Sequence, residues 1–376
     1  MKILISGDFC PIGRNAQIIK DENYSSLFNG FEDVVKEVDY AIVNLECPIT
    51  TSSEAIKKTG PCIKTESPKA LKALQYAGFD LLTLANNHIQ DYGSKGVIDT
   101  INKAKEFGFE TVGAADSLKN AKKPFIKEIN GIKVGILNIA ENEFCAATDS
   151  QAGAYTFDLV DNFNQIKLLR NKVEKLIVIY HGGREHYQLP TPEQRKRFRF
   201  FIENGADAIV AHHTHCFSGY EYYNNKPIVY SLGNFIFDYK KKYQKGKWTE
   251  GMSVILNLKD NNFTVELIPH YQGRKKDSTL KLLEEDEKSD FFKSIDSLNK
   301  IIIDDALFMK EWNMYLETQE ASYLAHLYVK NKYIRYAFML GLLPKRFLRN
   351  KHNRILLNYI RCESHHEISK GILYNV

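Results

Sequence analysis

Residues 191–215 read TPEQRKRFRFFIENGADAIVAHHTH and contain one complete unit of a helix, a glycine and a strand. Thr191 opens the helix as the first residue of a TPEQ capping box, with proline in the first turn. Apolar residues recur at helical spacing until Gly205, which ends the helix ahead of a short apolar strand at residues 208–210. A helix that leads directly into a strand is typical of the crossover between parallel strands of one sheet.

The same unit occurs twice earlier in the chain. In the first copy the helix opens at Ser67, closes at Gly78 and leads into an apolar strand at residues 80–84. In the second copy Gly108 ends the helix ahead of a short strand through residues 111–112. Further strand-like runs cover residues 133–139, 176–180, 228–232, 253–258 and 263–268, the last two joined by KDNN as a hairpin. The pattern predicts an α/β fold, with a mixed sheet wound with helices.

The character of the chain changes after Tyr271. The runs RKKDS and EEDEKSD are solvated charged segments, and no further unit of a glycine followed by a strand occurs up to the end of the chain. We therefore predict a main domain over residues 1–270 and a mostly helical, basic C-terminal extension over residues 271–376.

The overall composition describes an ordinary globular protein. The 376 residues include 44% hydrophobic side chains, and glycine, proline and cysteine are too few for a fibrous, disordered or disulfide-stapled chain. The formal net charge of +5 is small for this length, so we expect no nucleic acid as a partner. The six cysteines form no CxxC pair, and the first residues reach Asp8 before any signal-like apolar run. These features predict reduced thiols and a cytoplasmic location.

The basic residues gather near the C-terminus. From Asn331 onward the sequence has nine basic residues and two acidic ones, Glu363 and Glu367. The basic residues are Lys332, Arg335, Lys345, Arg346, Arg349, Lys351, Arg354, Arg361 and Lys370. One interpretation is a solvated helical face packed on the core. The other joins these residues to interleaved apolar ones as a membrane-peripheral segment that contacts anionic lipid or a membrane-bound synthase.

Five predicted strands are each followed by side chains that can bind a metal ion. In α/β folds, sites gather where the carboxyl ends of strands meet. These side chains are Asp8 in GDF, Asn44 and Glu46 in NLECPIT, Asn87 and His88 in LANNHIQDYG, His181 in HGGRE, and His213 and His215 in HHTH. If the chain is extended there, His213 and His215 point to the same side, as two ligands of one metal cluster must.

The ligand types indicate the chemistry. Carboxylate, amide and imidazole groups together suit Mn, Zn or Fe better than Mg or Ca, and one or two such ions would activate water and polarise a phosphoryl or carbonyl oxygen. His88 could protonate a leaving group with Asp91 orienting its ring, and Glu185 is a further candidate acid or base, or a hydrogen-bond acceptor behind the ligands.

Four other residues are candidates for contact with an anionic substrate. Arg14 and Arg184 offer fork-shaped donors that match phosphate or carboxylate. Asn44 and Asn234 are polar residues in the same segments, and Asn234 could instead fix a turn beside the metals. Asp238 could either fix a turn near the metals or bind them.

The order of these motifs, followed by KPIVYSLGNFIFD, resembles the CapA family of poly-γ-glutamate capsule synthesis proteins, within the calcineurin-like metallophosphatase superfamily. The resemblance covers about residues 1–270. It implies a four-layer α/β/β/α sandwich with a proton donor at His88. The metal positions that it implies are Asp8, Glu46, Asn87, His181, His213 and His215.

Two residues depart from the wider superfamily. In the wider superfamily a histidine stands two residues after the first aspartate, whereas this chain has Cys10 at that position. Cys10 is either a thiolate ligand or a small packed thiol. Glu46 stands in place of the usual bridging aspartate, which leaves open whether the site holds one ion or two.

The resemblance implies a metal-dependent, hydrolase-type protein of capsule or surface polymer biosynthesis. It would act on an anionic polymer, a polyglutamate or a polysaccharide, or on its precursor. The alternative is a non-catalytic accessory subunit that binds polymer or a membrane synthase through the basic tail. A third, weaker interpretation is a phosphoesterase unrelated to capsules.

Overall fold

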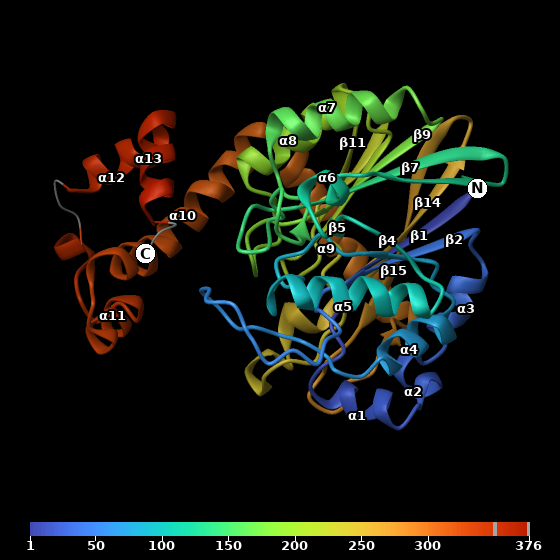
Figure 1. Ribbon diagram of the computed structural model, residues 1–376. Helices are drawn as coiled ribbons and strands as arrows, with labels where there is room; N and C mark the ends of the chain where they lie inside the picture. The colour runs from blue at the N-terminus through green and yellow to red at the C-terminus, as the bar shows by residue number, and fades with distance from the viewer. Residues whose placement is uncertain (349–351, 374–376) are drawn as a thin grey trace. The chain divides into compact units, whose positions relative to one another are not determined.

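A computed structural model describes residues 1–348 and 352–373 of the chain (Figure 1). It confirms the predicted α/β class, with two large sheets and helices on their outer faces. The chain divides into two compact units, Met1–Asp305 and Ala306–Val376. Arg349 and Lys351, two of the nine basic residues near the C-terminus, lie outside the described residues.

The first sheet has eight strands in the order β16-β15-β14-β1-β2-β3-β4, with β13 also paired to β1. Strand β1 is parallel to β2 and β13 and antiparallel to β14, so the sheet is mixed. The strands are β1 (Lys2–Phe9), β2 (Tyr40–Leu45), β3 (Leu81–Thr83), β4 (Glu110–Val112), β13 (Asn234–Ile236), β14 (Glu250–Lys259), β15 (Asn262–Tyr271) and β16 (Lys281–Leu282).

The second sheet has six strands in the order β11-β12-β10-β9-β7-β6. Strands β7, β9, β10 and β12 are parallel, with antiparallel strands at both edges. The strands are β6 (Phe125–Ile129), β7 (Ile132–Ala140), β9 (Lys175–His181), β10 (Ala208–His212), β11 (Tyr220–Tyr223) and β12 (Lys226–Val229). A separate pair joins β5 (Ala114–Ala115) to β8 (Gly153–Ala154).

Alternating side chains of the strands divide the core between two faces of each sheet. In β1 the buried residues Ile3 and Ile5 join the cluster between the sheets with Ile177 and Val210, whereas Leu4 belongs to the cluster under the outer helices. The helices of the first unit are α1 (Arg14–Lys20), α2 (Tyr24–Phe28), α3 (Phe31–Lys36), α4 (Lys69–Ala77), α5 (Gly93–Glu106), α6 (Leu118–Ala121), α7 (Leu159–Arg170), α8 (Pro192–Glu203) and α9 (Glu285–Ile303), with the 3-10 turns η1 (Lys241–Tyr243) and η2 (Gly246–Thr249).

Helices α1 to α5 cover the outer face of the first sheet, and α7 and α8 cover that of the second (Figure 1). On α8 the ring of Phe198 lies 5.1 Å from that of Tyr180 in β9. Together with the cluster between the sheets, this arrangement is the predicted four-layer sandwich.

The predicted helix, glycine and strand units are present. Helix α8 begins as predicted, because the Thr191 hydroxyl accepts a hydrogen bond from the backbone N–H of Gln194 at 3.1 Å. The predicted hairpin turns at Asp260 and Asn261, whose φ values of 46° and 67° match a two-residue turn between twisted strands.

Helix α9 belongs to the first unit. Its residues Phe291 and Ile295 join the cluster between the sheets, and the ring of Phe291 lies 4.6 Å from that of Phe217. The second unit contains α10 (Asp305–Tyr328), α11 (Lys332–Met339), η3 (Lys345–Leu348), α12 (His352–Arg361) and α13 (Glu363–Leu373), as the predicted helical extension requires. Within residues 1–348 and 352–373, no helix combines the length and the apolar character needed to cross a bilayer.

Candidate metal centre

The candidate centre lies where strands of both sheets end. Asp8 pairs in register with Asn44 across β1 and β2, and His181 pairs with His212 across β9 and β10. Because these strands are parallel within each sheet, their carboxyl ends meet at one edge. The predicted ligands at these strand ends are all buried.

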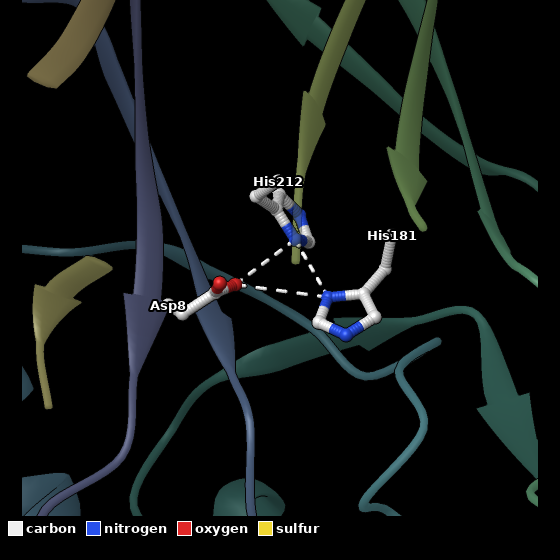
Figure 2. Close-up of side chains that lie close together, drawn as sticks. All are labelled: Asp8, His181 and His212. Carbon is white, nitrogen blue, oxygen red and sulfur yellow. Dashed lines mark hydrogen bonds and ion pairs between the residues drawn. The ribbon is translucent and has the colours of Figure 1, made fainter. Parts of the chain in front are cut away.

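Asp8, His181 and His212 form a first group of side chains that point toward one another (Figure 2). Oδ1 of Asp8 lies 3.1 Å from Nδ1 of His212 and 3.6 Å from Nδ1 of His181. The two Nδ1 atoms are 2.8 Å apart. Asn44 donates a hydrogen bond of 2.8 Å to the same carboxylate oxygen.

A second group surrounds the other ring nitrogen of His181. Nε2 of His181 lies 3.0 Å from Oδ1 of Asn87, 3.0 Å from Nδ1 of His213 and 3.6 Å from Oε1 of Glu46. Ligand atoms that share one tetrahedral ion are about 3.4 Å apart when the metal–ligand bonds are about 2.1 Å. The three distances from His181 therefore fit ligands of one shared cation.

A third group consists of Asp8, Glu46 and His215. It shares Glu46 with the second group and Asp8 with the first, so Glu46 lies between two adjacent sets of ligand atoms. Glu46 is 0% exposed, and neither of its carboxylate oxygens has a hydrogen-bond donor among the described residues. A buried carboxylate without a donor is costly unless a cation neutralises it.

The buried charges shift the pKa values of the group. Burial, followed by the nearby Asp8 carboxylate, raises the pKa of Glu46 well above its ordinary value. Burial would also raise the pKa of Asp8, but His212 and the other histidines lower it below the ordinary value. Burial lowers the pKa of His181, and it lowers that of His213 to about 4, so both imidazoles are neutral and able to bind a metal.

These residues fit a divalent cation. The two groups that share Glu46 offer carboxylate, amide and imidazole atoms, a donor set suited to Mn, Zn or Fe. An ion held there would act as a Lewis acid toward a phosphoryl or carbonyl oxygen and make water more acidic.

The backbone around the two histidines differs from the prediction. Strand β10 ends at His212, and His213 and His215 have φ values of 103° and 56°. The expectation that these side chains converge because the chain is extended is wrong. A turn brings them to the same centre, and the left-handed conformation of two non-glycine residues stores strain of the kind found at functional sites.

His88 and Asp91 form the pair that the sequence predicts. Nδ1 of His88 lies 2.6 Å from Oδ2 of Asp91, and that oxygen also accepts a hydrogen bond of 2.6 Å from the backbone N–H of Ile63. Burial lowers the pKa of His88 in spite of the carboxylate. Nε2 of His88 has no hydrogen-bond partner in the described part of the chain, so it is the ring nitrogen available to a substrate.

Lys58 is a member of this cluster that sequence reasoning missed. Its ammonium pairs with Oδ1 of Asp91 and lies 3.4 Å from both Nδ1 of His88 and the backbone oxygen of Asn87. The side chain is only 5% exposed. Nothing local in the irregular segment around Lys58 indicated this position.

His212 is the second residue that sequence reasoning missed. It is the last residue of β10 and is fully buried beside Asp8. The available signal was its place in the HHTH run, where the two later histidines received the ligand roles.

Cys10 lies in a small apolar cluster with Cys47, Ile63, Phe237 and Trp248. Burial, and then the neighbouring thiol of Cys47, raises the pKa of Cys10 well above its ordinary value. Cys10 belongs to none of the candidate ligand groups of the described residues. These observations favour the packed thiol over the thiolate ligand.

The two predicted substrate arginines have different surroundings. Arg14 binds Asp238 through both a 2.9 Å and a 2.7 Å hydrogen bond, and it donates to the backbone oxygens of Arg274 and Lys275. Four of the roughly five N–H donors of a guanidinium are thereby occupied. Arg184 is half-buried, and its charge is one of those that act on Glu185.

The remaining predicted residues lie close to the ligands. Burial would raise the pKa of Glu185, but His215 and His213 lower it below the ordinary value. Oδ1 of Asn234 lies 2.9 Å from Nδ1 of His215, and the amide of Asn234 donates to the backbone oxygen of Trp248 at 3.0 Å. Asn234 therefore positions His215, and Asn44 is fully buried against Asp8.

Comparison with known proteins identifies relatives that match more than half of the chain. The chain is 32% identical over 240 residues to the capsule biosynthesis protein CapA of Bacillus anthracis, covering 60% of this chain and 57% of that protein. It is 30% identical over 225 residues to the PGA biosynthesis protein CapA of Bacillus subtilis strain 168, covering 59% of each. The matches thus span less than two thirds of these relatives.

A protein of Mycobacterium tuberculosis, named as a probable polyglutamine synthesis accessory protein, is 26% identical over 215 residues, 54% of this chain and 56% of that protein. Among solved structures, a 5'-nucleotidase precursor of Thermus thermophilus is 12% identical with a TM-score of 0.43, covering 79% of this chain and 58% of that one.

The family comparison covers the strands and loops that carry the candidate ligands. Residues 2–239 match the family described as bacterial capsule synthesis protein PGA_cap. This range includes every residue of the three ligand groups, together with the pair His88 and Asp91. The chain belongs to the PGA_cap family of bacterial capsule synthesis proteins.

Proposed function

We propose that this protein is a metal-dependent hydrolase of capsule or surface polymer biosynthesis, which acts on an anionic polymer or its precursor. The observation that carries the proposal is Glu46, a buried carboxylate without a hydrogen-bond donor, placed between two sets of ligand atoms. Family membership supports the connection to capsules.

In this proposal each side chain has a separate task. His181, His213, His215, Glu46 and Asp8 hold one or two divalent ions, with Asn87 as the amide ligand. Asp91 accepts a hydrogen bond from Nδ1–H of His88 and fixes the ring. When the ring is in its cationic form, Nε2 carries the second proton, which passes to a leaving group and leaves the neutral imidazole. Lys58 pairs with Asp91 and balances the charge of its buried carboxylate.

The test begins with metal content per chain, measured by plasma mass spectrometry on protein purified without chelator. We expect one or two equivalents of Mn, Fe or Zn, and their loss from a His213→Ala, His215→Ala double variant. Phosphoester and polyglutamate substrates are then assayed with a His88→Ala variant, which should keep its metal and lose turnover by about 10²-fold or more. A double variant that keeps its metal in the first step, or a His88→Ala variant with full turnover in the second, would remove the corresponding part of the proposal.

A second candidate is a non-catalytic accessory subunit. The observation that favours it is Cys10, which lies in an apolar cluster where the wider superfamily supplies a histidine ligand. The name of the mycobacterial relative points in the same direction. Such a subunit would bind polymer or a membrane synthase, with the basic tail from Asn331 as a candidate contact to either.

Polymer production in cells separates the two candidates. If the protein is an enzyme, a Glu46→Gln or His88→Ala variant at normal abundance should abolish production. If it is an accessory subunit, those variants should support production like the original chain, whereas loss of the whole protein should not.

A further inference from the structure

A cluster of exposed lysines lies beside the candidate metal centre, in a segment that none of the roles above uses. Residues 239–248 read YKKKYQKGKW. Lys240, Lys241, Lys242, Lys245 and Lys247 are all exposed. Only Lys247 pairs with a carboxylate, that of Glu250 at 3.0 Å, among the ion pairs of the described residues. Four ammonium groups of this segment therefore face solvent without a carboxylate partner.

A stack of aromatic rings joins this segment to the ligands. The ring of Tyr243 lies 5.6 Å from His186 and 4.5 Å from Trp248, and Trp248 lies 4.4 Å from the ligand His215. Trp248 is 7% exposed, and its indole N–H donates to the backbone oxygen of Phe237 at 3.0 Å. Packed aromatic rings therefore connect the lysine segment to the metal centre.

A second basic segment runs beside the first. The backbone N–H of Lys275 donates to the backbone oxygen of Gln244 at 3.2 Å, which places Arg274, Lys275 and Lys276 next to the lysine cluster. All three are exposed. Arg14 and the buried Asp238 connect both segments, because Asp238 binds Arg14 and accepts a hydrogen bond of 3.2 Å from Gln244. Two chain segments therefore contribute cations to one surface.

We propose that this surface, Lys240–Lys245 with Arg274–Lys276, binds an extended polycarboxylate chain and leads it to the metal centre. The inference rests on the proposed function and adds to it the surface along which the polymer reaches that site. Closely spaced cations without carboxylate partners attract a polyanion more strongly than a single anion, since the attraction of each charge adds along the polymer. A free amino acid, with one or two carboxylates, would occupy only part of the surface.

The aromatic rings argue against single-stranded nucleic acid as the occupant. Proteins that bind single strands offer exposed ring faces on which bases stack. Here Tyr243 stacks on both Trp248 and His186, and Trp248 packs at a tilt against His215, so these rings already contact one another. A polymer of carboxylates needs no ring face, only cations along its path.

The experiment measures binding of fluorescently labelled poly-γ-glutamate to the full-length protein by anisotropy at several salt concentrations. The test variant carries Lys240→Gln, Lys241→Gln, Lys242→Gln and Lys245→Gln. The control variant removes the same charge at the opposite end of the strands, with Lys2→Gln, Lys127→Gln, Lys133→Gln and Lys259→Gln, four exposed lysines. We expect the test variant to bind about tenfold or more weakly, and the control to stay within about twofold of the original chain.

If both variants lose affinity equally, net charge alone attracts the polymer and the proposal is overturned. It is also overturned if the test variant binds the polymer as tightly as the original chain. If polyphosphate competes better than unlabelled poly-γ-glutamate, the polycarboxylate is not the ligand of this surface, and a phosphate polymer takes its place in the proposal. Metal content and turnover of a small phosphoester are measured on the same samples. If the proposed catalytic function is wrong, all three proteins lack metal or turnover, while the difference in polymer binding between the variants remains.

Discussion

At the scale of single residues, Glu46 gives the sharpest test of the centre. A Glu46→Gln variant keeps the shape of the side chain but removes a charge that has no donor in the described structure. Without metal, we expect the variant to equal or exceed the original chain in stability, by up to about 2 kcal/mol. With Mn or Zn added, only the original chain should gain stability. Urea unfolding with chelator and with metal measures both effects.

Glu221 supplies the matched control for this prediction. It is also buried, but it pairs with Arg199 at 2.8 Å and accepts a hydrogen bond of 2.6 Å from the hydroxyl of Tyr230. Glu221→Gln should therefore destabilise the protein with or without metal. If Glu46→Gln behaves like Glu221→Gln, the carboxylate of Glu46 has an ordinary structural role.

His270 predicts a pH dependence of stability. Burial lowers the pKa of this fully buried imidazole to about 4, below the value of about 6.5 expected in the unfolded chain. The unfolded state therefore binds the proton first, and stability falls as the pH decreases from about 6.5 to about 4. A His270→Gln variant should lose less stability over that window, by up to about 3 kcal/mol.

Urea unfolding at pH 7, 6, 5 and 4 compares the two proteins. Burial also lowers the pKa of His88 and His213, so the difference between the two slopes is the measured quantity. Parallel slopes would mean that His270 does not contribute to acid sensitivity.

The candidate ligands could be predicted from sequence because a ligand-type side chain directly after an apolar strand is a local signal. Lys58, and the pairing of Arg14 with Asp238, could not. Lys58 reaches Asp91 from an irregular segment, and Arg14 meets a carboxylate that is 224 positions away. Such contacts depend on how distant loops pack, and neither spacing nor residue type encodes that packing.

At the scale of elements, the approach of β13 to β1 depends on Gly7. A Cβ at this position would lie 2.1 Å from the backbone oxygen of Gly233. Gly7→Ala should cost about 3 kcal/mol or more, because neither backbone can yield without moving Asp8. Metal affinity should fall with it. Both quantities can be measured by urea unfolding and by metal titration.

Gly108→Ala is the control for this substitution. Gly108 has a φ of 78°, but no atom lies within 4 Å of the added Cβ, so only the backbone strain of about 1 kcal/mol is expected. An equal cost for the two substitutions would mean that β13 can move away from β1 without consequence.

The repeated helix, glycine and strand units were predictable, because caps, glycines and apolar periodicity are all local. The place of β13 was not. Residues 228–232 read as one strand, whereas the structure ends β12 at Val229 and returns the chain to the other sheet as β13. Transfer between sheets depends on tertiary packing, which a run of apolar residues does not reveal.

At the scale of the whole molecule, α9 is the element that we predicted from sequence to be part of the C-terminal extension, whereas the structure places it in the first unit. Residues 284–290 are strongly charged, which favoured assigning them to the extension. Their apolar neighbours Phe291, Ile295 and Ile302 are nevertheless buried, and the first compact unit runs to Asp305. One face of α9 is solvated while the other completes the core between the sheets.

This membership predicts that two truncated chains will behave differently. A chain that ends at residue 305 keeps α9 and its hydrogen bonds from Arg195 to the backbone oxygen of Ile302 and the carboxylate of Asp305, both 2.7 Å. We expect it to unfold cooperatively and to retain its metal. A chain that ends at residue 283 exposes the surface under Phe291 and Ile295, at about 1.5–3 kcal/mol for each lost side chain. It should be less stable by several kcal/mol in urea unfolding. Equal stability of the two chains would place α9 outside the core, and an unfolded 305-residue chain would show that the first unit needs the helices that follow it.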